Sequence, residues 1–100
     1  MSRVITYNQI IQDYVYHLAL MFRANNQEEQ YNAWNGFCKF RYIVQEAIDV
    51  VDDELQYGIL NSIQNNILGT LSMYEQEIDF KQILSKMHSD LDDYKKLLEK

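Results

Sequence analysis

The segment over residues 31–51, YNAWNGFCKFRYIVQEAIDVV, constrains the fold of this chain more than any other stretch. On a helix of 3.6 residues per turn it is apolar over most of its circumference. One arc consists of Ala33, Phe37, Phe40, Val44, Ala47 and Val51, and a second of Tyr31, Trp34, Cys38 and Tyr42. Because a helix that is apolar on two sides needs neighbours on two sides, we expect this segment to be the central helix.

Helix starts recur along the chain in the pattern of a capping box, a short polar residue followed three residues later by Gln or Glu. The pairs are Thr6 with Gln9, Asn26 with Glu29, Asp53 with Gln56, and Asp79 with Gln82. Apolar residues at steps of three and four follow each pair, and no stretch alternates with a period of two. We predict a single all-α domain over residues 1–100, an antiparallel bundle of four helices, or of three if one helix continues through residues 49–54. The Asn35-Gly36 pair favours a break, but we expect the central helix to continue through it.

The net charge of −6 comes entirely from the second half of the chain. Residues 49–100 hold five lysines against eleven Asp and Glu, whereas residues 1–48 are balanced. A surface of this sign repels phosphate, so we expect no direct binding of nucleic acid. It is complementary to a basic partner, such as a nucleic-acid-binding protein, although acidity also simply keeps a small domain in solution.

Composition also bears on the compartment. The sequence has one cysteine, so an intramolecular disulfide is excluded, as is typical of a reducing compartment. No apolar run approaches the roughly 18 residues of a membrane span, and no signal-peptide pattern is visible. We therefore expect a cytoplasmic protein without membrane contact. Abundant Asn, Ile and Tyr are typical of A/T-rich genomes, which points to a bacterium, a phage or another mobile element.

Residues that carry chemistry are scarce. Neither His17 nor His88 belongs to a Glu-x-x-His pair, and the chain has no phosphate-binding glycine loop and no nucleophile elbow. We therefore expect no catalytic residues, no metal and no cofactor. Asp13 precedes His17 by one helical turn, so its carboxylate could raise the imidazole pKa, but His17 also borders the apolar row and we expect a histidine at the boundary of the core.

One alternative is a carboxylate-metal enzyme. Glu46, Asp49 and Asp53 recur at steps of three and four residues, and paired carboxylates hold Mg²⁺ beside a substrate phosphate. The Glu46-x-x-Asp49 spacing resembles one carboxylate pair of the all-helical nucleotide pyrophosphohydrolases of the MazG type. This resemblance implies a metal-dependent nucleotide hydrolase, but no second pair follows at the corresponding distance.

Large side chains remain after the four apolar rows have filled a bundle of this size. Since Tyr, Trp and Arg dominate binding hot spots, we expect a small, acidic, non-enzymatic protein-binding module. An inhibitor, an immunity protein or an adaptor that occludes a partner's surface fits this description, by analogy with other small chains that lack catalytic groups. The residues expected to bind the partner are Tyr16, Leu20, Tyr31, Trp34, Arg41, Tyr42, Asp49, Asp52 and Asp53.

Two questions stay open at this level. The surplus apolar residues equally suit a structural homodimer, formed through the side of Tyr16 and Leu20 or through the C-terminal apolar row. Trp34, Cys38 and Tyr42 have the spacing of either core or interface residues.

Overall fold

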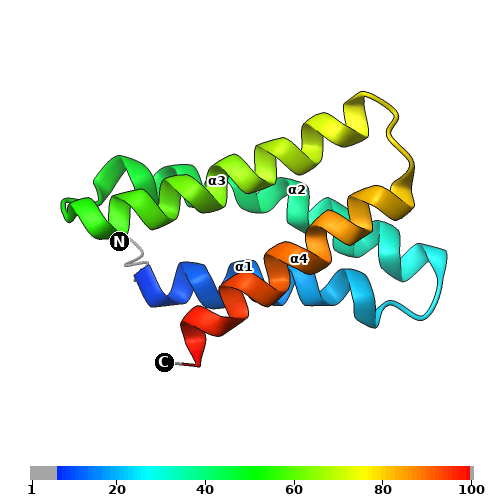
Figure 1. Cartoon of the computed structure of the whole chain (residues 1–100), viewed down its shortest axis with the longest axis horizontal. Helices are drawn as coiled ribbons and strands as arrows, with labels where there is room; N and C mark the ends of the chain where they lie inside the picture. The colour runs from blue at the N-terminus through cyan, green and yellow to red at the C-terminus, as the bar shows by residue number, and fades with distance from the viewer. Residues whose placement is uncertain (1–6, 100) are drawn as a thin grey trace.

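A computed structural model describes residues 7–99, and within them the chain forms a bundle of four helices with no strand. The helices are α1 (Tyr7–Arg23), α2 (Gln27–Val50), α3 (Glu54–Glu75) and α4 (Phe80–Leu98) (Figure 1). The prediction of an all-α bundle is confirmed. The three-helix alternative is wrong, because Val51 is extended (φ −78°, ψ 135°) and ends α2.

Three of the predicted capping residues begin helices. The side chain of Asn26 accepts a hydrogen bond from the Glu29 amide at 2.9 Å, and that of Asp53 accepts one from the Gln56 amide at 2.9 Å. Asp79 caps α4 by accepting from the Lys81 amide at 3.1 Å. These bonds satisfy amides that have no partner inside a helix. The fourth predicted cap, Thr6, lies outside the described residues.

Helix α2 has neighbours on two sides, as predicted, but the central position predicted for it is taken by α1, which contacts all three other helices. Helix α2 packs against α1 on one side and α3 on another, and it continues unbroken through Asn35 and Gly36. The first of its two apolar arcs is buried from Ala33 to Ala47. Figure 1 shows α2 and α3 running side by side, while α4 runs obliquely across α1.

The core is formed by side chains from all four helices. Its largest members that are fully buried include Tyr14, Phe37, Phe40, Leu60 and Met87. The rings of Tyr14 and Phe40 are nearly parallel with centroids 6.4 Å apart, and Tyr94 meets Tyr14 edge-on at 5.0 Å. None of the helices described is long and apolar enough to cross a membrane.

Candidate protein-interaction surface

Nearly half of the aromatic side chains lie on the surface. The chain has thirteen aromatic residues, all within the described part, and six of them are 41% to 66% exposed. These six are Tyr16, Phe22, Tyr31, Tyr42, Tyr57 and Tyr74. Large aromatic groups contribute strongly to binding when a partner covers them, so their arrangement decides where a partner can dock.

Four exposed side chains lie along the seam between α2 and α3. Tyr31 and Tyr42 are eleven residues apart, which is about three turns, so they share one side of α2. Tyr57 and Leu68 have the same spacing on α3. We call the surface formed by Tyr31, Tyr42, Tyr57 and Leu68 the α2–α3 face.

A side chain of α3 fixes where this face lies. Gln64 occupies the same side of α3 as Tyr57 and Leu68, at steps of seven and four residues. Its amide nitrogen donates to the Arg41 carbonyl of α2 at 3.0 Å and to Oε1 of Gln45 at 3.3 Å. The row of α3 that carries Tyr57 and Leu68 is therefore turned toward α2.

Arg41 holds the Tyr42 ring in place at the centre of the face. Its Nη2 donates to the Tyr42 hydroxyl at 2.6 Å, and its Cζ lies 4.7 Å from the ring centroid. Tyr42 is nevertheless 59% exposed. A side chain that is already ordered loses less entropy when a partner covers it.

Cys38 is half-buried on the same side of α2 as Tyr31 and Tyr42. Burial raises the pKa of the Cys38 thiol, and the Arg41 guanidinium offsets this only in part. A thiol in this environment stays protonated and behaves as a small apolar group.

Of the predicted acidic residues, Asp49 follows Tyr42 by two helical turns and shares its side of α2, whereas Asp52 and Asp53 line a hollow with Tyr7 of α1 at the α2–α3 junction. Asp49, Asp52 and Asp53 are all exposed. Asp49 accepts a hydrogen bond from the Gln45 side chain at 3.0 Å, and Asp53 caps α3. Within residues 7–99, no three His, Cys, Asp or Glu side chains gather as metal ligands, so Glu46 does not join Asp49 and Asp53 in such a site.

Trp34 belongs to the core. Only 8% of its surface is exposed, and its ring centroid lies 5.6 Å from that of Phe37, 5.0 Å from that of Tyr74 and 6.0 Å from that of Phe80. The α3–α4 turn brings Tyr74 and Phe80 over the indole. Of the two alternatives that the sequence leaves open for Trp34, its burial favours the core, and the predicted surface position is corrected because the sequence does not show where that turn folds back.

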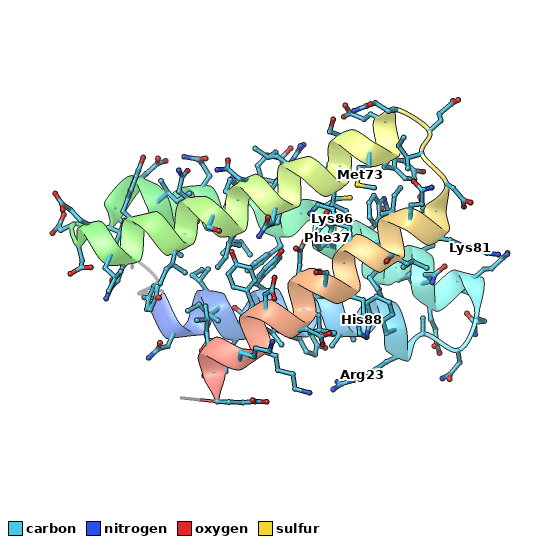
Figure 2. All side chains as sticks on the ribbon, viewed as in Figure 1. Arg23, Phe37, Met73, Lys81, Lys86 and His88 are labelled. Carbon is cyan, nitrogen blue, oxygen red and sulfur yellow. The ribbon has the colours of Figure 1, made fainter. Side chains whose placement is uncertain are left out.

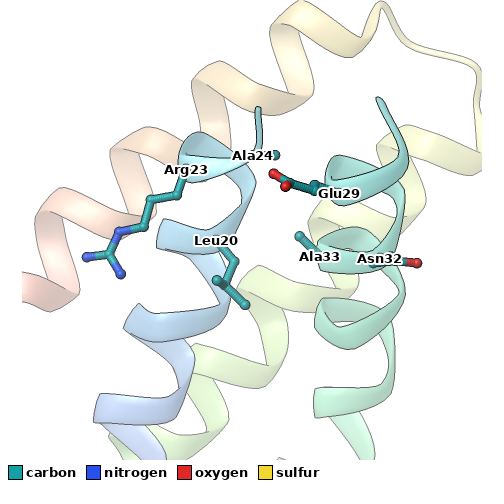
Figure 3. A pocket seen from close by; sticks show the side chains of 6 residues that line it. All are labelled: Leu20, Arg23, Ala24, Glu29, Asn32 and Ala33. Atoms are coloured by element: carbon teal, nitrogen blue, oxygen red, sulfur yellow. The ribbon is translucent and has the colours of Figure 1, made fainter. Parts of the chain in front are cut away.

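Tyr16 and Leu20 lie on a different face, formed by α1 and α2. Helix α1 follows the side of α2 that carries Gly36, where an added Cβ would come within 3.4 Å of the His17 ring. Leu20 is half-buried and lines a hollow of about 320 Å³ near the α1–α2 turn (Figure 3). The predicted residues therefore divide between two faces, and Tyr16 does not join Tyr42.

His17 lies at the boundary of the core, as predicted. Burial lowers the pKa of its imidazole, and the Asp13 carboxylate, which raises it, is the weaker influence. The ring lies 5.0 Å from that of Phe40 and is half-buried against α2. Since desolvation outweighs the nearby charge, the alternative of a raised imidazole pKa is wrong.

Sequence reasoning missed a polar seam between α3 and α4. Nζ of Lys86 donates to the Asn66 carbonyl and to Oγ1 of Thr70, both at 3.0 Å, and forms an ion pair with Asp90 at 2.8 Å (Figure 2). Asn66 also donates to the Tyr94 hydroxyl at 3.1 Å. The four-residue steps between Lys86, Asp90 and Tyr94 were the available signal, because such residues share one side of a helix.

Comparisons of the chain with protein-family models, with curated proteins and with solved structures gave no match. We therefore infer the function of the chain from the geometry of the α2–α3 face and of its neighbouring side chains.

Proposed function

We propose that this chain is a small, acidic, non-enzymatic protein-binding module that contacts its partner through the α2–α3 face. The observation that carries the proposal is the row of exposed side chains along one seam, with Tyr31 66% and Tyr42 59% exposed beside a filled core. An apolar centre with a polar surround is the usual anatomy of a protein interface.

The charge around the face favours a basic partner. Asp49, Asp52 and Asp53 stand at the end where α2 meets α3, and Arg41 makes its hydrogen bond to Tyr42 instead of pairing with any of them. Carboxylates at the rim of an interface attract lysine and arginine side chains and accelerate encounter. Such a module acts by covering the partner's surface, as an inhibitor, an immunity protein or an adaptor in the cytoplasm does.

Affinity capture from the lysate of the host cell tests this proposal. The wild-type chain and the Tyr16→Ala control should retain the same protein, and the Tyr31→Ala/Tyr42→Ala variant should lose it while keeping its helical circular dichroism. The retained complex should weaken as salt rises from 50 to about 300 mM, because rim charges are screened. Equal capture by all three proteins would contradict a role for this face.

A structural homodimer is the second candidate. Leu98, the last residue of the C-terminal apolar row, is 37% exposed and open to a second copy, whereas Ile83, Met87 and Tyr94 of α4 are buried within the protomer. The net charge of −6 on every copy opposes this association. Sedimentation at micromolar concentration decides the question, and a strict monomer removes this candidate.

A further inference from the structure

We infer that an aromatic cavity at one end of the α2–α3 face binds a cationic group, the ammonium or guanidinium of a lysine or arginine side chain of the partner. The cavity has a volume of about 230 Å³. It is lined by Tyr31, Trp34, Tyr74 and Phe80, together with Gln27 and Gln30. The assignment to a partner's side chain rests on the proposed function, whereas the affinity for a cation follows from the cavity itself.

Rings from three helices form the walls. Trp34 of α2 lies 5.0 Å from Tyr74 of α3 at an interplanar angle of 41°, and 6.0 Å from Phe80 of α4 at 72°. Tyr74 is 53% exposed and Tyr31 is 66% exposed, so the cavity is open to solvent. Because Trp34 is buried against Tyr74 and Phe80, the ring faces that a cation can reach are those of the exposed Tyr31 and Tyr74.

The charges around the cavity favour binding of a cation. No lysine or arginine lines the cavity. A neighbouring hollow shares Tyr74 and Phe80 and adds the carboxylates of Glu75 and Glu77. Aromatic walls with carboxylates nearby favour a cation over a neutral group of the same shape, because both the ring quadrupole and the formal charge attract it.

The turn that carries these carboxylates has a fixed and unusual backbone. Glu77 has φ of 60°, in the left-handed region that residues other than glycine and asparagine seldom adopt. Its amide donates to the Tyr74 carbonyl at 3.1 Å, and the Ile78 amide donates to the Met73 carbonyl at 3.1 Å. The chain thus holds an acidic residue beside the rings at a position where glycine would be less strained.

The position of the cavity points to a side chain of the partner as the source of the cation. Tyr31 belongs both to the cavity and to the α2–α3 face, so a protein lying along that face can place a basic side chain between Tyr31 and Tyr74. A free quaternary ammonium compound offers the same chemistry from a different source, and the experiment below separates the two.

Fluorescence titration tests the inference, because Trp34 is the only tryptophan and lines the cavity. The probes are N-acetyl-lysine methylamide, its arginine counterpart and tetramethylammonium, with N-acetyl-norleucine methylamide as the neutral match for lysine. The lysine and arginine amides should change Trp34 emission saturably, and the norleucine amide should not. Equal responses to lysine and norleucine amides would overturn the inference.

Two variants test whether the change in Trp34 emission depends on the aromatic rings of the cavity. Tyr74→Leu keeps an apolar wall but removes a ring, and it should weaken binding of the lysine amide about two- to fivefold, the effect of one exposed cation–π contact. Tyr16→Leu, at an exposed tyrosine on the α1–α2 face outside the cavity, is the control and should leave binding unchanged. Unaltered affinity in Tyr74→Leu, with helical circular dichroism retained, would overturn the assignment to this cavity.

The remaining outcomes separate this site from the proposed function. Cation binding without any captured protein would support the cavity while the proposed function fails. Capture of a partner that depends on Tyr42, without binding of either amide, would overturn the cavity and leave the proposed function intact. Binding of tetramethylammonium at least about tenfold tighter than the lysine amide would overturn the assignment to a partner's side chain.

Discussion

The rings of Trp34 and Tyr74 lie with their centroids 5.0 Å apart, which ties the first part of α2 to the last part of α3. Phe80 meets the same indole from the start of α4. One side chain therefore closes this end of the bundle, so the stability of the fold depends on it more than on the exposed tyrosines nearby.

Replacement of Trp34 by alanine should destabilise the protein by about 3–5 kcal/mol, the usual cost of removing a buried ring of this size. Tyr42→Ala is the matched control, and it should cost less than about 1 kcal/mol because the ring is exposed. Chemical denaturation followed by circular dichroism gives both free energies of unfolding. Similar values for the two variants would mean that Trp34 is not part of the core.

The polar seam between α3 and α4 gives a second prediction. Lys86→Met should destabilise the protein by about 1–3 kcal/mol, because Asp90 loses its charged partner and the Asn66 carbonyl loses a donor. Lys81→Met, on the exposed surface at the start of α4, should change stability by less than about 0.5 kcal/mol. Thermal and urea unfolding would measure the free energy of unfolding of both variants. Equal losses would mean that the Lys86 contacts do not stabilise the protein.

His17 predicts a dependence of stability on pH. Its folded-state pKa lies below the ordinary value of 6.5, so the unfolded chain takes up a proton more readily than the folded one. The contribution of His17 to stability is therefore complete above about pH 6.5 and is lost as the pH falls toward its lowered pKa. His17→Gln should flatten the curve of unfolding free energy against pH in this range, and identical curves for the wild type and the variant would refute the assignment.

Two glycines in helices should respond differently to alanine. Nothing lies within 4 Å of a Cβ added at Gly58, so Gly58→Ala should stabilise the protein by about 0.5–1 kcal/mol through the lower entropy of the unfolded chain. At Gly36 the same group would come within 3.4 Å of the His17 ring, so the gain should be smaller. Denaturation midpoints would rank the two variants, and a larger gain at Gly36 would contradict this packing.

Local sequence signals were sufficient for the helices. Asn26, Asp53 and Asp79 cap helices because their side chains bond to amides two or three residues away, so the relevant partners are adjacent in sequence. The apolar spacing of α2 likewise predicted its buried arc and its two neighbours. The sequence did not decide whether one helix continues through residues 49–54. The extended backbone of Val51 separates α2 from α3 there.

The candidate site was harder to predict because it depends on how the helices pack. Tyr31, Trp34 and Tyr42 share one arc in sequence, yet α3 and α4 cover only Trp34. Tyr57 and Leu68 could not be predicted as site residues, because the sequence does not show that their side of α3 faces α2. The Gln64 contacts across the seam determine this orientation. The types of side chain in the sequence predicted which residues could bind a partner. The packing of the helices determines which of these residues share one face.

The central claim is that the α2–α3 face binds a partner protein, and calorimetric titration of the captured partner tests it most directly. Tyr42→Ala should weaken binding by at least about tenfold, as removal of a central aromatic contact does, while Tyr16→Ala on the α1–α2 face should change it less than about twofold. Equal affinity for wild type and Tyr42→Ala, or a greater loss in Tyr16→Ala, would contradict the claim.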